Sequence, residues 1–271
     1  MAEIGMMGHR LRMGAAAVAL AVGLPWSAVA VDVEPHRAVY KMTLERAQSA
    51  SGVVGAGGTM LYQWADSCDG WTIEQRYKLR MQYSEQEDAE LSISFVTWES
   101  KDGARYRFNV RKLKDGDTTE ELRGDARLDA PGKAGEAKFV RPETTTIELP
   151  AGTLFPTAHT LALIDAAASG ATFLSRQVFD GGTVEGPFEV TGGIGTEHPA
   201  EPGASNPLLR RRWWPVRLAF FPADSQSPQP DYELGMDLQD NGIARELILD
   251  YGNFVVRAKL ESIEPMPKPH C

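Results

Sequence analysis

The chain has 271 residues, 42% of them hydrophobic and 24% charged, and its formal net charge is −9 at pH 7. This length allows a sizeable core, and the composition is that of a folded protein rather than a disordered one. An acidic chain with dispersed Lys and Arg is not typical of a protein whose main partner is nucleic acid or an anionic membrane.

Residues 1–30 have the three parts of a secretory signal peptide. Arg10 and Arg12 form a basic start, Met13–Leu24 is a short apolar run, and Ala28–Ala30 is a small-x-small cleavage site. The run is too short to span a membrane. An amphipathic or buried N-terminal helix is the alternative, but glycines and a proline interrupt the run. We expect cleavage after the last alanine.

Cleavage there would leave residues 31–271 with a formal charge of −10, because the removed Glu3, Arg10 and Arg12 sum to +1. The residue immediately after the cleavage position is Val31 rather than a cysteine, so the sequence does not indicate a lipid anchor. No later apolar run reaches the length of a membrane-spanning helix. We therefore expect an exported, soluble protein that does not span the membrane.

An alternation of apolar and polar residues dominates the remaining chain. It is clearest at Trp71–Tyr83 and is typical of an antiparallel strand with one solvated face. The same alternation predicts further strands at Tyr40–Leu44, Thr59–Trp64, Leu91–Trp98, Tyr106–Val110, Thr144–Leu149, Phe173–Phe179, Val216–Phe220, Tyr232–Leu238, Ile243–Tyr251 and Phe254–Leu260.

One segment, Thr157–Ser169, predicts a helix. Leu161, Ile164 and Ala168 would share an apolar stripe, and Gly170 is at the stop position. We expect the first residue of the helix to cap it. The stripe should plug one opening of the sheet and contact the inward-facing residues of the clearest strand.

Turn-forming residues organise the C-terminal part. Asp240–Gly242 and Gly252–Asn253 predict tight turns that join the last strands into a meander. Ile194–Pro207 is rich in glycine and proline, and we interpret it as a surface loop within one domain because strands are expected on both sides. A dozen or so strands with one helix predict a mainly β fold in which a large antiparallel sheet closes or is plugged at its ends.

The chain has only two cysteines, Cys68 and Cys271. In an exported protein this predicts one long-range disulfide that ties the C-terminus to the start of the fold. A partial zinc site that also uses His270 is the alternative. It is the weaker interpretation, because a pair of exported cysteines is far more often a disulfide.

The sequence contains no nucleophile elbow, Walker loop, zincin helix or EF-hand loop, so no cofactor is expected. His159 could act as a general base with Asp165, but a spacing of six residues does not place them on one helix face. The Asp115–Asp117 and Asp180–Gly182 segments resemble calcium ligands in composition, and turn chemistry explains both.

Several short motifs occur in order ahead of the terminal cysteine: PHRAVY at 35–40, CDGW at 68–71, WESKDG at 98–103, LPAGTLFPTAH at 149–159, FDG at 179–181, LAFF at 218–221, DNG at 240–242 and DYG at 250–252. Together they resemble the envelope integrity protein B family of periplasmic proteins from alphaproteobacteria. One departure is Asn253, where an acidic residue would be expected.

The resemblance implies a single domain, residues 31–271, folded as a β-spiral. In such a fold a broad sheet is wound into a partly open barrel with one or two plugging helices, similar in shape to periplasmic lipoprotein carriers. It also implies a periplasmic role in cell-envelope homeostasis, and it supports the same cysteine pairing. No catalytic residues come with it.

Two functions are consistent with these observations. The first is a non-enzymatic factor that binds an envelope protein or an apolar ligand such as a lipid or acyl chain. The second is an envelope hydrolase that uses His159. For the first, the candidate interior consists of large alternating residues, which could either fill the sheet or line a cavity, with a filled core the simpler expectation: Tyr40, Met60, Tyr62, Trp71, Tyr77, Met81, Phe95, Phe108, Phe220 and Met236.

Overall fold

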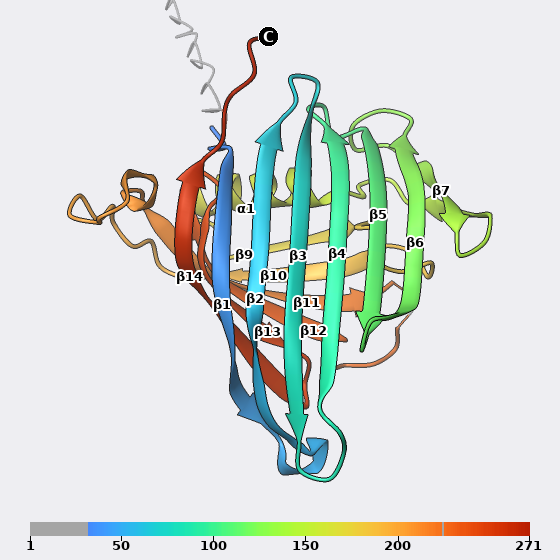
Figure 1. Cartoon of the computed structure of the whole chain (residues 1–271). Helices are drawn as coiled ribbons and strands as arrows, with labels where there is room; N and C mark the ends of the chain where they lie inside the picture. Colours follow the sequence, from blue (N-terminus) through green and yellow to red (C-terminus); the bar gives the residue numbers. More distant parts are fainter. Residues whose placement is uncertain (1–31, 224) are drawn as a thin grey trace, which may run out of the picture. The chain divides into compact units, whose positions relative to one another are not determined.

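The computed structural model describes residues 32–223 and 225–271 (Figure 1). The expected signal peptide, residues 1–30, lies outside the described residues. The described chain is mainly β, with one α-helix. None of its helices is long and apolar enough to cross a membrane.

Fourteen strands form a single antiparallel sheet. They are β1 His36–Ala47, β2 Val53–Asp66, β3 Gly70–Tyr83, β4 Ala89–Ser100, β5 Arg105–Lys114, β6 Asp117–Leu128, β7 Gly135–Arg141, β8 Thr145–Leu149, β9 Phe173–Val178, β10 Phe188–Ile194, β11 Trp213–Pro222, β12 Tyr232–Gln239, β13 Ala244–Asp250 and β14 Phe254–Pro265.

The sheet does not close into a barrel by strand pairing. Its order runs from β8 back to β1, then through β14 down to β9, so β8 and β9 are the two edges. The backbone nitrogen of Leu154 donates to Gln177 at 2.8 Å, and that of Phe179 donates to Leu154 at 3.0 Å. The segment after β8 thus runs along the edge of β9 and covers part of it. The expectation of a wound, partly open sheet is confirmed.

Each strand expected from the alternation falls on an observed strand, but three strands were missed: β6, β7 and β10. In β6, charged residues separate the buried Leu122, Ala126 and Leu128. The consecutive glycines Gly192 and Gly193 interrupt the alternation of apolar and polar residues in β10. Pairing with neighbouring strands, rather than local sequence, keeps these segments extended.

Helix α1 covers Pro156–Ala168, and its C-terminus is as expected. Gly170 has φ +80°, its nitrogen donates to Ala167 at 3.0 Å, and the nitrogen of Ala171 donates to Ala166 at 2.9 Å. This pair of hydrogen bonds is a Schellman motif, which satisfies the last carbonyls of the helix.

The expected N-cap of α1 is wrong. Thr157 lies inside the helix, and Phe155 occupies the cap position without a side-chain hydrogen bond. The cap comes from another element: the carboxylate of Glu99 on β4 accepts hydrogen bonds from the nitrogens of Thr157 at 2.7 Å and Ala158 at 2.8 Å. A distant carboxylate therefore satisfies two of the free amide groups that begin every helix.

The expected apolar stripe of α1 also needs correction. Leu163, Ile164 and Ala167 are buried, whereas Leu161 is only half-buried and Ala168 is exposed. The buried stripe packs with residues of β9 to β12 rather than with β3. A Cβ atom on the buried Gly192 of β10 would lie 3.2 Å from Leu163 Cδ2, so a glycine there lets the helix approach closely.

Candidate ligand-binding cavity

A cavity of about 600 Å³ is lined by residues from both halves of the sheet and from α1. Its apolar lining includes Ile73, Ile93, Phe95, Leu163, Phe188, Leu218, Phe220, Leu234, Met236, Leu238, Leu247 and Leu249. In Figure 1 the strands β9 to β12 cross behind β1 to β5, with α1 behind the upper part of the front strands. A volume within the range of about 300–1,000 Å³ is typical of small-molecule sites.

Strand register arranges the lining of the front strands in rows. Trp64, Ile73 and Thr97 are paired across β2, β3 and β4 and form one row. Tyr62, Gln75 and Phe95 form the next row, and Met60, Tyr77 and Ile93 form the third. Glu99 lies two residues beyond the first row, so that row is the α1 end of the cavity.

Tyrosine supplies many of the polar groups of the cavity. The chain has seven tyrosines, and all but Tyr83 line the cavity: Tyr40, Tyr62, Tyr77, Tyr106, Tyr232 and Tyr251. The hydroxyl of Tyr40 donates to the backbone oxygen of Ala244 at 2.7 Å, and that of Tyr106 donates to the backbone oxygen of Asp180 at 2.9 Å. Burial raises the pKa of each of these six phenols, which therefore stay neutral.

The structure gathers most of the candidate interior residues around the cavity: Tyr40, Met60, Tyr62, Tyr77, Phe95, Phe220 and Met236. The other three lie elsewhere. Met81 and Phe108 are buried in separate apolar clusters. Trp71 is half-buried against Trp64, with their ring centroids 6.0 Å apart. The simpler expectation of a filled interior is wrong for this part of the sheet, and binding by these residues stays a prediction.

Glu99 was not expected to have a role. Its side chain is 2% exposed, and burial raises its pKa to about 7, although the hydrogen bonds from Thr157 and Ala158 oppose that rise. The sequence did contain an indication of this role: Glu99 lies two residues after Thr97 and four after Phe95, so it shares their inward face of β4. A carboxylate on the inward face of a strand requires a partner.

His159 lies on the buried side of α1 and lines the cavity. Burial lowers its pKa to about 4, so the imidazole is neutral at physiological pH. Its Nε2 atom is withdrawn from solvent and has no hydrogen-bond partner among the described residues. The structure does not pair it with Asp165, whose side chain is exposed.

Charged groups near the cavity are few. The charged side chains in its lining are those of Lys112, Asp180, Glu185 and Asp231. Lys112 forms an ion pair with Glu120. Asp180 accepts a hydrogen bond from the nitrogen of Gly182 at 2.8 Å, which is the turn expected from the sequence. No group of three or more His, Cys, Asp or Glu in the described residues could hold a metal ion.

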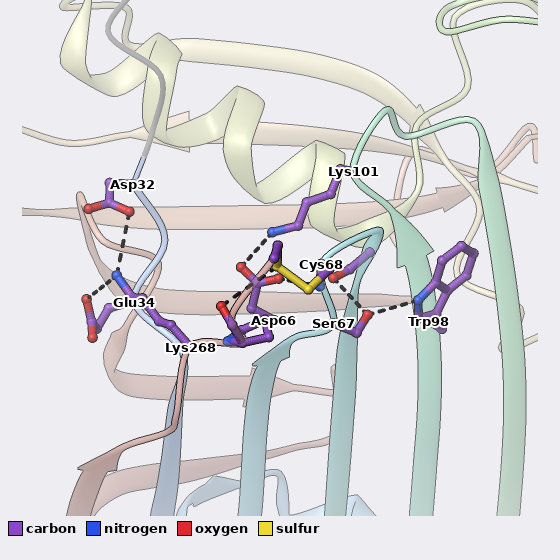
Figure 2. Close-up of polar contacts among 11 residues, drawn as sticks. Asp32, Glu34, Asp66, Ser67, Cys68, Trp98, Lys101 and Lys268 are labelled. Atoms are coloured by element: carbon purple, nitrogen blue, oxygen red, sulfur yellow. Dashed lines mark hydrogen bonds and ion pairs between the residues drawn. A yellow bond between two sulfur atoms is a disulfide. The ribbon is translucent and has the colours of Figure 1, made fainter.

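The predicted disulfide between Cys68 and Cys271 is present, and its Cα atoms are 5.8 Å apart (Figure 2). Because both sulfurs are used, the alternative of a zinc site is excluded for this state. Cys68 is in the turn between β2 and β3, where its nitrogen donates to Asp66 at 2.9 Å. Lys101 pairs with the other carboxylate oxygen of Asp66 at 2.8 Å.

Further contacts hold the segment that leads to the disulfide. The nitrogen of Met266 donates to Pro35 at 2.8 Å. Lys268 lies 3.3 Å from a carboxylate oxygen of Glu34 and 3.9 Å from one of Asp32 (Figure 2). The C-terminal segment is thereby fixed at both ends, to the start of β1 and to the β2–β3 turn.

Comparisons with known proteins identify the family. The family model described as EipB-like matches residues 27–267. The chain belongs to the EipB-like family. The resemblance noted in the sequence motifs is therefore confirmed over nearly the whole length of the chain.

A protein sequence and a solved structure, both from Brucella abortus, are similar to this chain. The cell envelope integrity protein EipB of strain 2308 is 34% identical over 248 residues, which are 89% of this chain and 88% of that protein. A crystal structure of a beta-barrel-like protein of the domain of unknown function DUF1849 has a TM-score of 0.81 at 32% identity. That similarity covers 88% of this chain and 100% of the other.

Proposed function

We propose that this protein supports the integrity of the cell envelope from the periplasm, and that it does so by binding the apolar part of a lipid in the cavity between the two halves of its sheet. The cavity itself carries the proposal. Its volume of about 600 Å³ and its mainly aliphatic and aromatic lining suit an acyl chain. This favours a lipid over a protein partner as the first ligand to test.

The envelope role and the compartment have separate support. The Brucella relative is named a cell envelope integrity protein. The disulfide between Cys68 and Cys271 suits an oxidising compartment such as the periplasm. The basic, apolar and small-residue segments of residues 1–30 suit export with cleavage.

A non-enzymatic role is part of the same proposal. A hydrolase that used His159 would need a nucleophile and an orienting group within hydrogen-bond reach of the imidazole. The Nε2 atom of His159 has no such partner among the described residues. The low pKa of His159 also makes it a weak base at neutral pH.

Displacement of N-phenyl-1-naphthylamine, a fluorescent apolar probe, tests the binding function. The wild-type protein should bind the probe and release it when an acyl ester is added. Ile93→Trp should weaken binding at least tenfold, because Ile93 lines the cavity and the larger ring would occupy it. Ser94→Trp, one position along on the opposite face of β4, is the matched control and should bind as wild type does.

Deletion of the gene should sensitise cells to detergents and to antibiotics that target the cell wall. The Ser94→Trp protein should restore tolerance, and the Ile93→Trp protein should not. If both variants restored tolerance, the envelope role would not depend on ligand binding in the cavity. Wild-type tolerance in the deletion strain would overturn the envelope role itself.

A further inference from the structure

Two nitrogen-bearing side chains at the α1 end of the cavity have unmet hydrogen-bonding capacity. Trp64 is 2% exposed and His159 is 5% exposed, and both line the cavity. Trp64 Nε1 and His159 Nε2 are each withdrawn from solvent without a hydrogen-bond partner among the described residues. Leaving a buried donor unpaired is unfavourable, because its hydration is lost without replacement, so these two groups need an explanation.

Contacts across the sheet place the two side chains in the same part of the cavity. The ring of Trp64 packs edge-on against that of Trp71, which is paired in register with Glu99. Glu99 in turn holds the nitrogen of Thr157, two residues before His159. Trp64 and His159 thus both border the α1 end of the cavity, although they are 95 positions apart in the sequence (159 minus 64).

The chemistry of this end selects a neutral oxygen acceptor. An indole nitrogen is only a donor, and a neutral imidazole can donate from Nε2. The charged residues of the lining are on β5, in the segment 180–185 and just before β12, not in the row of Trp64, Ile73 and Thr97. A carboxylate at the α1 end would lose its hydration in a mainly apolar site near the buried carboxylate of Glu99. The cation that acts on His159, Arg176 of β9, is exposed to solvent, so a neutral acceptor is favoured.

We propose that the ligand of the cavity is a neutral acyl ester whose carbonyl oxygen accepts hydrogen bonds from Trp64 Nε1 and His159 Nε2 at the α1 end. This inference rests on the proposed lipid-binding function and narrows it to esterified chains. It excludes free fatty acids and pure hydrocarbons as preferred ligands. Trp64 and His159 act here as specificity residues.

The test compares three ligands of similar size by probe displacement: methyl laurate, laurate, and an alkane with as many heavy atoms as the ester. The ratio of the dissociation constants of ester and alkane removes the shared hydrophobic contribution. In Trp64→Phe and His159→Phe this ratio should rise about fivefold to tenfold relative to wild type, as the loss of one hydrogen bond of about 1 kcal/mol predicts. Wild type should bind laurate more weakly than methyl laurate.

Matched controls are available for both substitutions. Trp71→Phe changes a neighbouring tryptophan that does not line the cavity, and His198→Phe changes an exposed histidine; neither should alter the ratio. Retained probe binding shows that a variant is folded, and either variant alone suffices for the test. An unchanged ratio in a folded variant, or tighter binding of laurate than of the ester, would overturn this inference and leave lipid binding intact. No binding of the probe or of any of the three ligands by wild type would instead overturn the proposed function.

Discussion

The Oε2 atom of Glu99 on β4 lies 2.7 Å from the backbone nitrogen of Thr157 at the start of α1. The same carboxylate accepts from the next backbone nitrogen at 2.8 Å, so one side chain of the front strands holds the beginning of the helix. The helix contributes Leu163 and His159 to the cavity. The carboxylate of Glu99 therefore helps to position this cavity wall, together with the packing of the buried stripe of α1.

Glu99→Ala should destabilise the protein by about 2 kcal/mol or more, because it removes a helix cap and leaves two amide groups without an acceptor. Glu90→Ala on the same strand is the control. Glu90 forms an exposed ion pair with Lys78, which is worth about 0–1 kcal/mol. Urea denaturation of both variants measures the difference. Equal unfolding midpoints would show that the cap does not contribute.

The pH dependence of stability should show two opposing contributions. Burial lowers the pKa of His159 to about 4. The contribution of His159 to the free energy of unfolding is therefore complete above pH 6.5 and is lost as the pH falls toward 4. Burial raises the pKa of Glu99 to about 7, so its contribution is complete below pH 4.5 and is lost as the pH rises through 7. For each group, the free energy of unfolding changes by at most about 1.4 kcal/mol per pH unit.

Difference curves against wild type separate the two groups. The stability of Glu99→Gln relative to wild type should increase as the pH rises from 4.5 to 7. That of His159→Phe should increase as the pH falls from 6.5 to 4. Denaturant titrations over this range provide the curves, and two slopes of the same sign would contradict the assignment.

The helix stripe gives a matched pair of core substitutions. Leu163 is 1% exposed and packs against β10, whereas Leu161 is half-buried. Leu163→Ala should lower the free energy of unfolding by about 2–5 kcal/mol, the usual range for a buried leucine. Leu161→Ala should lower the free energy of unfolding by clearly less than Leu163→Ala does. A larger loss at Leu161 in thermal or denaturant unfolding would mean that the opposite face of α1 is the buried one.

Reduction of the disulfide should weaken the fold. The bond joins residues 203 positions apart, and closing so long a loop restricts the unfolded chain by up to about 5 kcal/mol in the loop-entropy treatment. The double variant Cys68→Ser with Cys271→Ser should unfold at lower denaturant than oxidised wild type, and at the same midpoint as reduced wild type. Labelling of both thiols in the native, unreduced protein would disprove the pairing.

The sequence was informative where its pattern is local. Alternation located most strands, Gly170 located the end of α1, and the number of cysteines indicated the disulfide. Apart from the disulfide, which follows from there being only two cysteines, contacts between distant segments could not be predicted in this way. Glu99 caps a helix that begins 57 residues later (156 minus 99), so the local rule pointed to Thr157 instead. The cavity could not be predicted for the same reason. Alternation identifies which side chains face inward, but it does not give the distance between them and the strands that face them.

Lipid binding in the cavity is tested most directly by purifying the protein from envelope extract of its own host and measuring the bound lipid by mass spectrometry. Wild type and Ser94→Trp should carry an esterified acyl lipid in near-stoichiometric amount. Ile93→Trp should carry little or none. Wild-type protein without bound lipid, or equal amounts of lipid in the two tryptophan variants, would contradict a ligand-binding cavity.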